Sequence, residues 1–238
     1  MKKRLLASAL VVAALSLEAS YSVEHYNFDN HLVHVVTFDP QEYAVKLVDG
    51  EGLEKLESMA QRSEALVALS GGFYQSDGSP SGVFYSEETK DITRPWKLRG
   101  AIAWDEDFNV KFGRTIAITE DWQGYSYVLG GAPLLLLNGE IQDFNVEETR
   151  ENFLTFHRAR TAIGMTEDGL VVLAMAHGMD SNAVGFTVYE WASWLKELGV
   201  VNALNLVGGD SSALFVEGKL FAECDKKIGN ALVVVEKP

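Results

Sequence analysis

The chain has 238 residues, 47% of them hydrophobic, and a formal net charge of −14 at pH 7. This length is typical of one domain, and the hydrophobic content is that of a folded protein rather than a disordered one. The negative charge argues against nucleic acid and anionic membrane surfaces as partners, because binding to phosphates at these surfaces needs a positive footprint.

Residues 1–22 have the pattern of a secretory signal peptide. The basic start Lys2–Arg4 precedes an apolar run from Leu5 to Leu17, and small residues for cleavage follow from Ala19. The run is shorter than the about 20 residues that cross a bilayer. We therefore expect a secreted or periplasmic protein with no stable membrane span after cleavage. An uncleaved N-terminal anchor is the alternative. Residues 23–238 are expected to form a single domain.

The apolar patterns after this segment predict many short strands and few helices. An excursion of about twenty polar, Glu-rich residues over 138–157 is expected to run over the surface, and such excursions are often lids or binding loops. In chain order, the predicted elements are strands over 32–38, 43–47, 66–69, 83–85, 101–104, 110–112, 115–118, 170–176, 201–206, 213–216 and 230–234, and helices over 52–61 and 187–198.

The clearest local prediction is the helix that begins at Thr187. Thr187 and Glu190 have the spacing of a capping box, and Gly199 marks the stop. The helix joins two predicted strands in a strand–helix–strand unit over 170–206, and such a unit favours parallel pairing of its strands. We expect an α+β fold with a mixed β-sheet.

The segment Asn205–Ser212 combines hydrogen-bonding groups with two glycines between two apolar runs. Gly208 and Gly209 permit close approach to the backbone, and Asp210 follows them with two hydroxyls. The same composition is also that of an ordinary turn.

From this segment and several others, the stretch of about 65–236 resembles the phosphodiester glycosidase family. The motifs occur in the family's order. They are Ser70–Tyr74, Gly130–Pro133, Asn138-Gly139, Arg158–Met165, Asn205–Ser212 and Asn230–Val234. The chain departs from the family pattern where Val207 replaces an Asp, where Asp210 replaces a Gly, and where His177-Gly178-Met179 replaces Asp-Gly-Arg.

The resemblance implies a site built from these motifs. A guanidinium at Arg160 suits phosphate binding, His177 at a strand end suits proton transfer, and Asp210 is the carboxylate of the glycine turn. Catalysis is assigned to Asp210 and His177. The substrate-binding residues are expected to be Gly71, Gly72, Phe73, Arg160, Thr161, Asn205, Gly208, Gly209, Ser211 and Ser212.

The function that follows is that of an exported glycosidase. Its substrate would be a sugar linked through a phosphodiester, of the N-acetylglucosamine-1-phosphodiester type or a cell-wall glycan. The alternative is an inactive family member that binds such a glycan. No cofactor is expected, and no metal-ligand spacing is recognisable, although Asp210 with neighbouring carboxylates leaves a divalent ion as an alternative. Cys224 is the single cysteine, so no intrachain disulfide forms.

Overall fold

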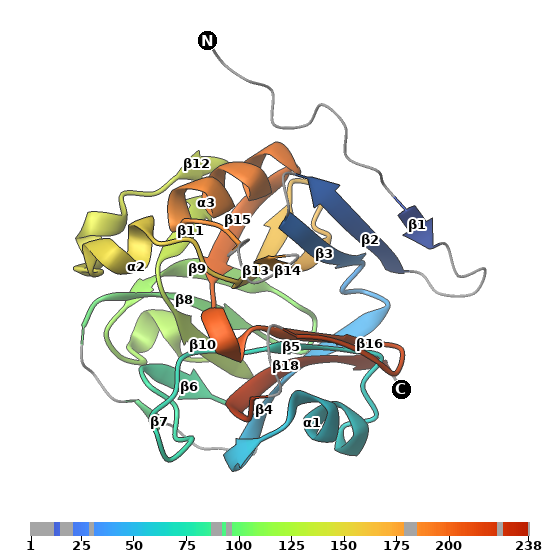
Figure 1. The fold of residues 1–238 in the computed structure, drawn as a ribbon. Helices are drawn as coiled ribbons and strands as arrows, with labels where there is room; N and C mark the ends of the chain where they lie inside the picture. Colours follow the sequence, from blue (N-terminus) through green and yellow to red (C-terminus); the bar gives the residue numbers. More distant parts are fainter. Residues whose placement is uncertain are drawn as a thin grey trace.

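The structure is a computed structural model that describes residues 12–14, 21–28, 31–86, 92–93, 97–178, 185–222 and 226–237. Within these ranges the chain forms three β-sheets and three short α-helices, which confirms the α+β class (Figure 1). Cys224, Met179 and most of the expected signal peptide lie outside the described residues, so the expectations about them stay predictions.

The largest sheet has eight strands and carries the predicted strand–helix–strand unit. Its strands, in order across the sheet, are β1 (Val12–Ala14), β2 (Tyr21–Phe28), β3 (His31–Phe38), β14 (Val171–Gly178), β13 (Arg160–Thr166), β15 (Val200–Asn205), β11 (Leu134–Leu137) and β12 (Glu140–Ile141). Both strands of the unit, β14 and β15, pair antiparallel with β13. They therefore run in the same direction, but the expected direct parallel pairing is wrong. A tight turn, closed by a hydrogen bond from the Thr166 N–H to the Leu170 carbonyl, joins β13 to β14 and makes them neighbours in the sheet. The other edge of β13 pairs with β15, so β13 lies between β14 and β15.

Two five-stranded sheets complete the fold, and every strand pair in the described residues is antiparallel. One sheet has the order β17 (Lys219–Ala222), β16 (Ala213–Val216), β5 (Val67–Ser70), β18 (Ile228–Glu236) and β4 (Tyr43–Glu54). The other has the order β7 (Ile92–Thr93), β6 (Val83–Tyr85), β10 (Tyr127–Gly131), β8 (Arg99–Trp104) and β9 (Val110–Thr115).

The helices are α1 (Leu56–Arg62), α2 (Glu151–Thr155) and α3 (Val188–Glu197). The capping box of α3 is present, and Gly199 follows the helix with a φ of +98°. The helix expected from residue 52 begins only at Leu56, because β4 continues through Glu54.

Two other expectations need correction. The strand expected over 110–112 extends to Thr115 as β9, and no second strand forms over 115–118, because the Thr115 hydroxyl bonds to the Ala117 backbone in a turn there. The excursion over 138–157 is not only a surface segment, because it buries Phe144, Glu147 and Leu154.

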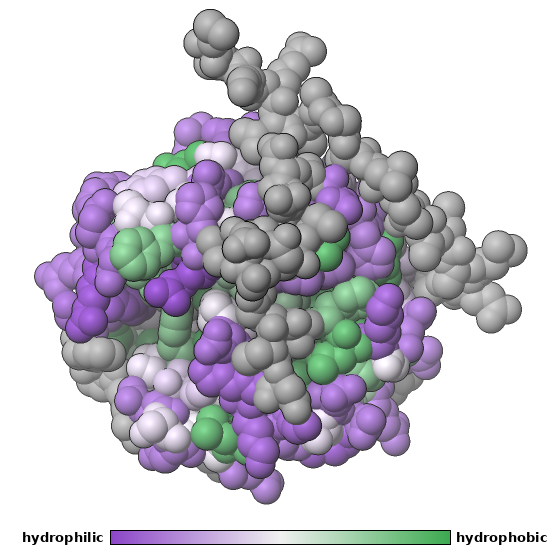
Figure 2. All heavy atoms as spheres, in the orientation of Figure 1, coloured by the Kyte–Doolittle hydropathy of each residue, from purple (hydrophilic) through white to green (hydrophobic). Residues whose placement is uncertain are grey.

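The main hydrophobic core lies between the three sheets and draws residues from each, such as Leu173, Leu232 and Ile102. A second cluster covers the outer face of the eight-stranded sheet, where Trp191 and Trp194 of α3 stack with ring centroids 5.5 Å apart. Figure 2 shows that the face in view is mostly hydrophilic, with apolar patches between polar side chains.

Candidate functional site

The turn after β15 carries the chain from the eight-stranded sheet into β16 of another sheet, and it ties three distant segments together. The Val207 N–H donates to the Gly71 carbonyl at 3.1 Å, and the Gly209 N–H donates to the Ala159 carbonyl at 2.8 Å. The Thr161 hydroxyl donates to the Val207 carbonyl at 2.5 Å. Segments 71–73, 160–161 and 208–212 thus converge, as the sequence predicts. Val207 is buried.

Gly71 and Gly72 pack too closely against their neighbours for any larger residue. A Cβ on Gly71 would lie 2.2 Å from the Asn230 Oδ1, and a Cβ on Gly72 would lie 2.6 Å from the Gly130 carbonyl oxygen. The Gly72 N–H donates to the Asn230 Oδ1 at 2.7 Å, and the Gly71 N–H donates to the Asn230 carbonyl at 3.1 Å. Both N–H groups are therefore used within the fold, and these glycines serve close packing.

Arg160 is the first residue of β13 and is 1% exposed. Its Nε donates to the Phe186 carbonyl at 3.0 Å, and its Nη2 donates to the carbonyls of Phe153 and Phe156 at 3.0 and 2.8 Å. Burial, with a smaller effect of Arg158, lowers the pKa of Arg160 to about 10, so it stays charged at neutral pH. Its Nη1 is buried and has no hydrogen-bond partner among the residues that the structure describes.

Two more unpartnered buried atoms lie in the same region. Asn205 donates through Nδ2 to the Ala132 carbonyl at 2.6 Å, while its Oδ1 has no partner in the described part of the chain. The same holds for the buried Ser212 hydroxyl. Ser211 differs, because its hydroxyl lies 2.8 Å from the Tyr74 hydroxyl. Buried polar atoms are nearly always hydrogen-bonded, so this concentration marks an unusual place in the fold.

The two residues predicted to be catalytic lie at the margins of this network. Asp210 is exposed, in the short 3₁₀ turn Gly209–Ser211. His177 is next to Ala176, the cross-strand partner of Arg160, so its side chain points to the opposite face of the sheet from Arg160.

On that face His177 ends a chain of three imidazoles. Its Nε2 lies 3.0 Å from the Nε2 of His34, and the Nδ1 of His34 lies 2.7 Å from the Nδ1 of His25. His34 is buried, which, with smaller effects of His177, His25 and Lys219, lowers its pKa to about 3. A neutral His34 can donate one of these hydrogen bonds and accept the other. In the part of the chain that the structure describes, no three His, Cys, Asp or Glu side chains are grouped to hold a metal ion.

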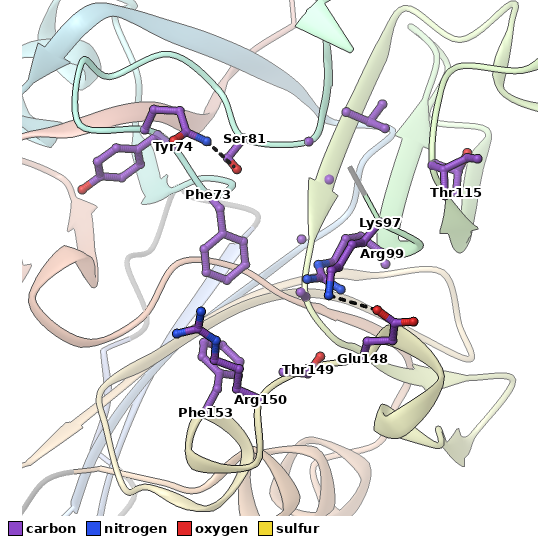
Figure 3. Close-up of a pocket in the computed structure, with 18 residues that line it drawn as sticks. Phe73, Tyr74, Ser81, Lys97, Arg99, Thr115, Glu148, Thr149, Arg150 and Phe153 are labelled. Carbon is purple, nitrogen blue, oxygen red and sulfur yellow. Dashed lines mark hydrogen bonds and ion pairs between the residues drawn. The ribbon is translucent and has the colours of Figure 1, made fainter. Parts of the chain in front are cut away.

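A pocket of about 540 Å³ opens beside the glycine turns (Figure 3). Its lining combines apolar and charged side chains, which are Phe73, Val83, Ile116 and Phe153, and Lys97, Arg99, Glu148 and Arg150. The Phe73 and Phe153 rings meet with centroids 6.1 Å apart and planes inclined by 60°. Of the site residues predicted from the sequence, only Phe73 lines this pocket.

The charged side chains of the pocket differ in their polar contacts. Lys97 forms an ion pair with Glu148 at 3.0 Å, and this contact lowers the pKa of the Glu148 carboxyl. Arg99 donates to the carbonyls of Leu98 and Glu147. Among the described residues, Arg150 forms no ion pair.

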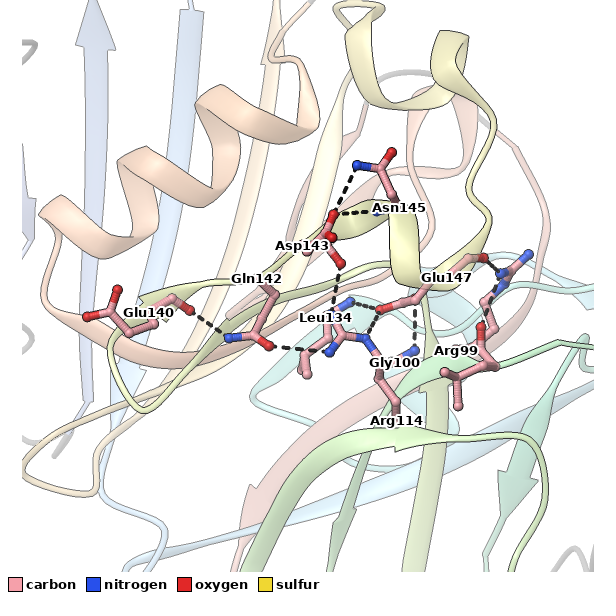
Figure 4. Close-up of polar contacts among 10 residues, drawn as sticks. Arg99, Gly100, Arg114, Leu134, Glu140, Gln142, Asp143, Asn145 and Glu147 are labelled. Carbon is pink, nitrogen blue, oxygen red and sulfur yellow. Dashed lines mark hydrogen bonds and ion pairs between the residues drawn. The ribbon is translucent and has the colours of Figure 1, made fainter.

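Glu147 anchors this wall of the pocket from behind (Figure 4). Its carboxylate is fully buried and accepts hydrogen bonds from the Leu134 and Gly100 N–H groups at 2.8 and 3.0 Å. It also accepts from the Arg114 Nε at 2.9 Å. Strands β8, β9 and β11 thereby hold the segment that continues into Glu148 and the rest of the wall.

Four of the other predicted residues contact the pocket lining from behind. Gly72 abuts Gly130, Asn205 binds Ala132, and Ser211 contacts Tyr74, with Gly130, Ala132 and Tyr74 all lining the pocket. Arg160 lies 5.0 Å from the Phe153 ring centroid. Sequence reasoning missed the charged wall itself. The signal for part of it was the long excursion over 138–157, which was noted without assigning its residues.

Comparison with known proteins agrees with the motif order. The family model described as phosphodiester glycosidase matches residues 63–235. The human protein named N-acetylglucosamine-1-phosphodiester alpha-N-acetylglucosaminidase is 28% identical over 184 residues, which cover 69% of this chain and 34% of that protein. The SPbeta prophage-derived uncharacterized protein YomE of Bacillus subtilis is 27% identical over 197 residues, which cover 76% of this chain and 29% of YomE. The chain thus spans about a third of the length of these relatives.

Two solved structures share the fold. The catalytic domain of the zebrafish N-acetylglucosamine-1-phosphodiester alpha-N-acetylglucosaminidase, auto-inhibited by its pro-peptide, superposes with a TM-score of 0.77 at 21% identity, covering 97% of this chain and 88% of that one. A hypothetical protein from Synechocystis gives a TM-score of 0.78 at 17% identity, covering 97% of this chain and 68% of that one.

Proposed function

Because the chain belongs to the phosphodiester glycosidase family, we propose that it hydrolyses a sugar linked through a phosphodiester, in the pocket beside the glycine turns. The observation that carries this proposal is the lining of that pocket. Aromatic rings on one side suit the apolar face of a sugar, and Lys97, Arg99 and Arg150 suit a phosphate.

The reaction makes modest demands on the protein. The bond between the anomeric carbon and the phosphodiester oxygen breaks, water adds its oxygen to that carbon, and the phosphate departs as a monoester. Glycosidases usually need a carboxylic acid to protonate the leaving oxygen and a carboxylate to assist attack. A phosphate monoester has a second pKa near 6 and leaves as a stable anion. One carboxylate and a cationic wall therefore suffice.

Glu148 is the candidate for that carboxylate. It is the carboxylate that lines the pocket among the described residues, and its ion pair with Lys97 keeps it ionised. An ionised carboxylate can stabilise the oxocarbenium-like transition state or remove a proton from water. Asp210 and His177 remain candidates from the family motifs, with Asp210 exposed beyond the pocket lining and His177 directed toward His34.

A binding protein without catalysis is the second candidate. It is favoured by the buried Val207 where the family has an Asp, and by the exposed position of Asp210. In that case the pocket would retain a phosphate-linked glycan without cleaving it, since shared fold does not fix function.

The test is hydrolysis of the aryl phosphodiester of N-acetylglucosamine-1-phosphate by the purified chain. We expect release of the free sugar, and Glu148→Gln should lower kcat at least about 100-fold, as removal of a catalytic proton-transfer group does. Glu140→Gln, an exposed change in the same excursion, is the matched control and should keep full activity. Tight binding of the substrate without any hydrolysis would establish the second candidate instead.

We also propose that the protein is exported. The basic and apolar pattern of residues 2–17 supports this, and cleavage after Ala19 would leave β2, which begins at Tyr21, whole. In the described residues no helix has the length and apolar character needed to cross a bilayer. Mass spectrometry of the exported fraction should find a new N-terminus between Ala19 and Val23. Recovery of the chain with Met1 from the cytosol alone would contradict export.

A further inference from the structure

The charge of the pocket is opposite in sign to that of the chain. Its lining carries three cations, Lys97, Arg99 and Arg150, and one carboxylate, Glu148, which sum to +2 in a chain of net charge −14. A local positive field in an acidic protein attracts anions to that place and repels them elsewhere.

The cations of the pocket do not form one cluster. Figure 3 shows Lys97 and Arg99 beside Glu148 on one side of the pocket, and Arg150 on another side near Phe153. Lys97 is paired with Glu148, whereas the side-chain hydrogen bonds of Arg99 to described residues go to the neutral carbonyls of Leu98 and Glu147. Arg99 lies near enough to Glu148 to help lower the pKa of that carboxyl, but neither Arg99 nor Arg150 forms an ion pair among the described residues, and the two guanidinium groups stand at two separate points.

The wall that carries these cations is built into the fold. The Glu147 carbonyl holds the Arg99 guanidinium, and the buried Glu147 carboxylate holds the backbone that leads to Arg150. Arg150 itself is the residue before α2, where its carbonyl accepts the Phe153 N–H at 2.9 Å. Strands and a helix thus fix the backbone positions from which the two cations extend.

One phosphodiester carries a single negative charge, which matches one of the two guanidinium groups. From this arrangement, and resting on the function proposed above, we infer that the substrate carries a second phosphate on its aglycone, with Arg99 at the scissile phosphodiester and Arg150 at the second phosphate. The substrate class is then a glycosyl phosphodiester whose aglycone is itself phosphorylated, as in a repeating glycosyl-phosphate chain. Arginine suits both positions, because its planar fork binds phosphate oxygens in pairs.

Two synthetic substrates test this inference. Both carry N-acetylglucosamine-1-phosphate esterified to propanediol, and they differ only in whether the far hydroxyl is free or phosphorylated. We expect kcat/KM to be about tenfold higher for the phosphorylated compound, the worth of one charge-assisted contact, and the ratio to fall with added salt. Arg150→Gln should bring the ratio close to one. Lys196→Gln, which removes an exposed cation of α3 outside the pocket, should leave the ratio as in the wild type.

The outcomes separate this inference from the proposed function. Cleavage of both compounds with equal kcat/KM, or faster cleavage of the free hydroxyl form, would overturn the second-phosphate assignment and leave the glycosidase intact. If neither compound is cleaved, the proposed catalysis fails. The second-phosphate assignment is then tested by measuring the binding of the same two compounds by titration calorimetry. Tighter binding of the phosphorylated one that depends on Arg150 supports the inference for a binding protein, and equal or absent binding overturns it.

Discussion

Glu147 offers the sharpest test of how the pocket wall is held. Glu147→Gln keeps the size of the side chain but removes its charge and replaces one acceptor oxygen by an NH2 donor. The new NH2 group then faces another donor at about 3 Å, which is the N–H of Gly100 or Leu134 or the Nε–H of Arg114. A buried donor left without an acceptor costs about 1–3 kcal/mol, and breaking a buried ion pair costs about 3–5 kcal/mol. Arg114 keeps 18% exposure of its side chain, which moderates the second cost. We expect the free energy of unfolding to fall by about 3 kcal/mol.

Urea denaturation followed by tryptophan fluorescence measures this loss. Glu140→Gln is the control, because its contact with Lys196 is 3.7 Å long and its side chain is 80% exposed, so a change within about 0.5 kcal/mol is expected. The double variant Glu147→Gln/Arg114→Gln should lose at least about 1 kcal/mol less than the sum of its single variants, since the two residues contact directly. A loss below about 1 kcal/mol for Glu147→Gln would refute the anchoring role.

Two further predictions concern the glycine turn and the histidine chain. Gly71→Ala should destabilise the fold by about 1–3 kcal/mol, because its Cβ would meet the Asn230 amide at 2.2 Å, and Asn230→Ala should relieve part of that loss in a double-variant urea titration. His34 has a folded pKa of about 3, below its ordinary value of 6.5, so the unfolded state takes up the proton first. The free energy of unfolding should therefore be highest above pH 6.5 as far as His34 contributes, and it should fall by up to about 1.4 kcal/mol per pH unit as the pH drops toward 3. His34→Gln should flatten that slope, whereas His157→Gln, at an exposed histidine, should keep it; equal slopes in all three proteins would contradict the assignment.

Sequence patterns predicted most of the local structure, because local rules determine it. The helix after Thr187 is fixed by its capping box and by Gly199, and both are sequence neighbours of the helix. The strand after Leu66 is a short apolar run that ends at glycine. Strand partners are different, since they depend on contacts far apart in the chain. Nothing in the unit over 170–206 indicates that β13 lies between its two strands.

The same division applies to the site. The motifs with glycines and hydroxyls were predicted to bind the substrate, and several of their residues lie behind the pocket lining, where close packing and buried hydrogen bonds restrict residue types. The cationic wall was missed, since Lys97 and Arg150 are separated in sequence and have no motif around them. Nor does the polar composition of the excursion reveal that Glu147 points inward while Glu148, its neighbour, faces the pocket.

Arg160, which the sequence predicts to bind substrate, makes its hydrogen bonds within the fold. Its guanidinium is charged, nearly fully buried and held by three carbonyls, so it joins the segment after β14, at Phe186, to α2 and the turn that follows it, at Phe153 and Phe156. A buried charge without a carboxylate partner is costly, and the fold retains it only where several hydrogen bonds offset its desolvation. By fixing Phe153, Arg160 sets the position of a pocket wall that also carries Arg150. A family signature at Arg160 can therefore mark the architecture of the pocket wall, while in the function proposed above the contacts to the substrate come from a segment with no signature.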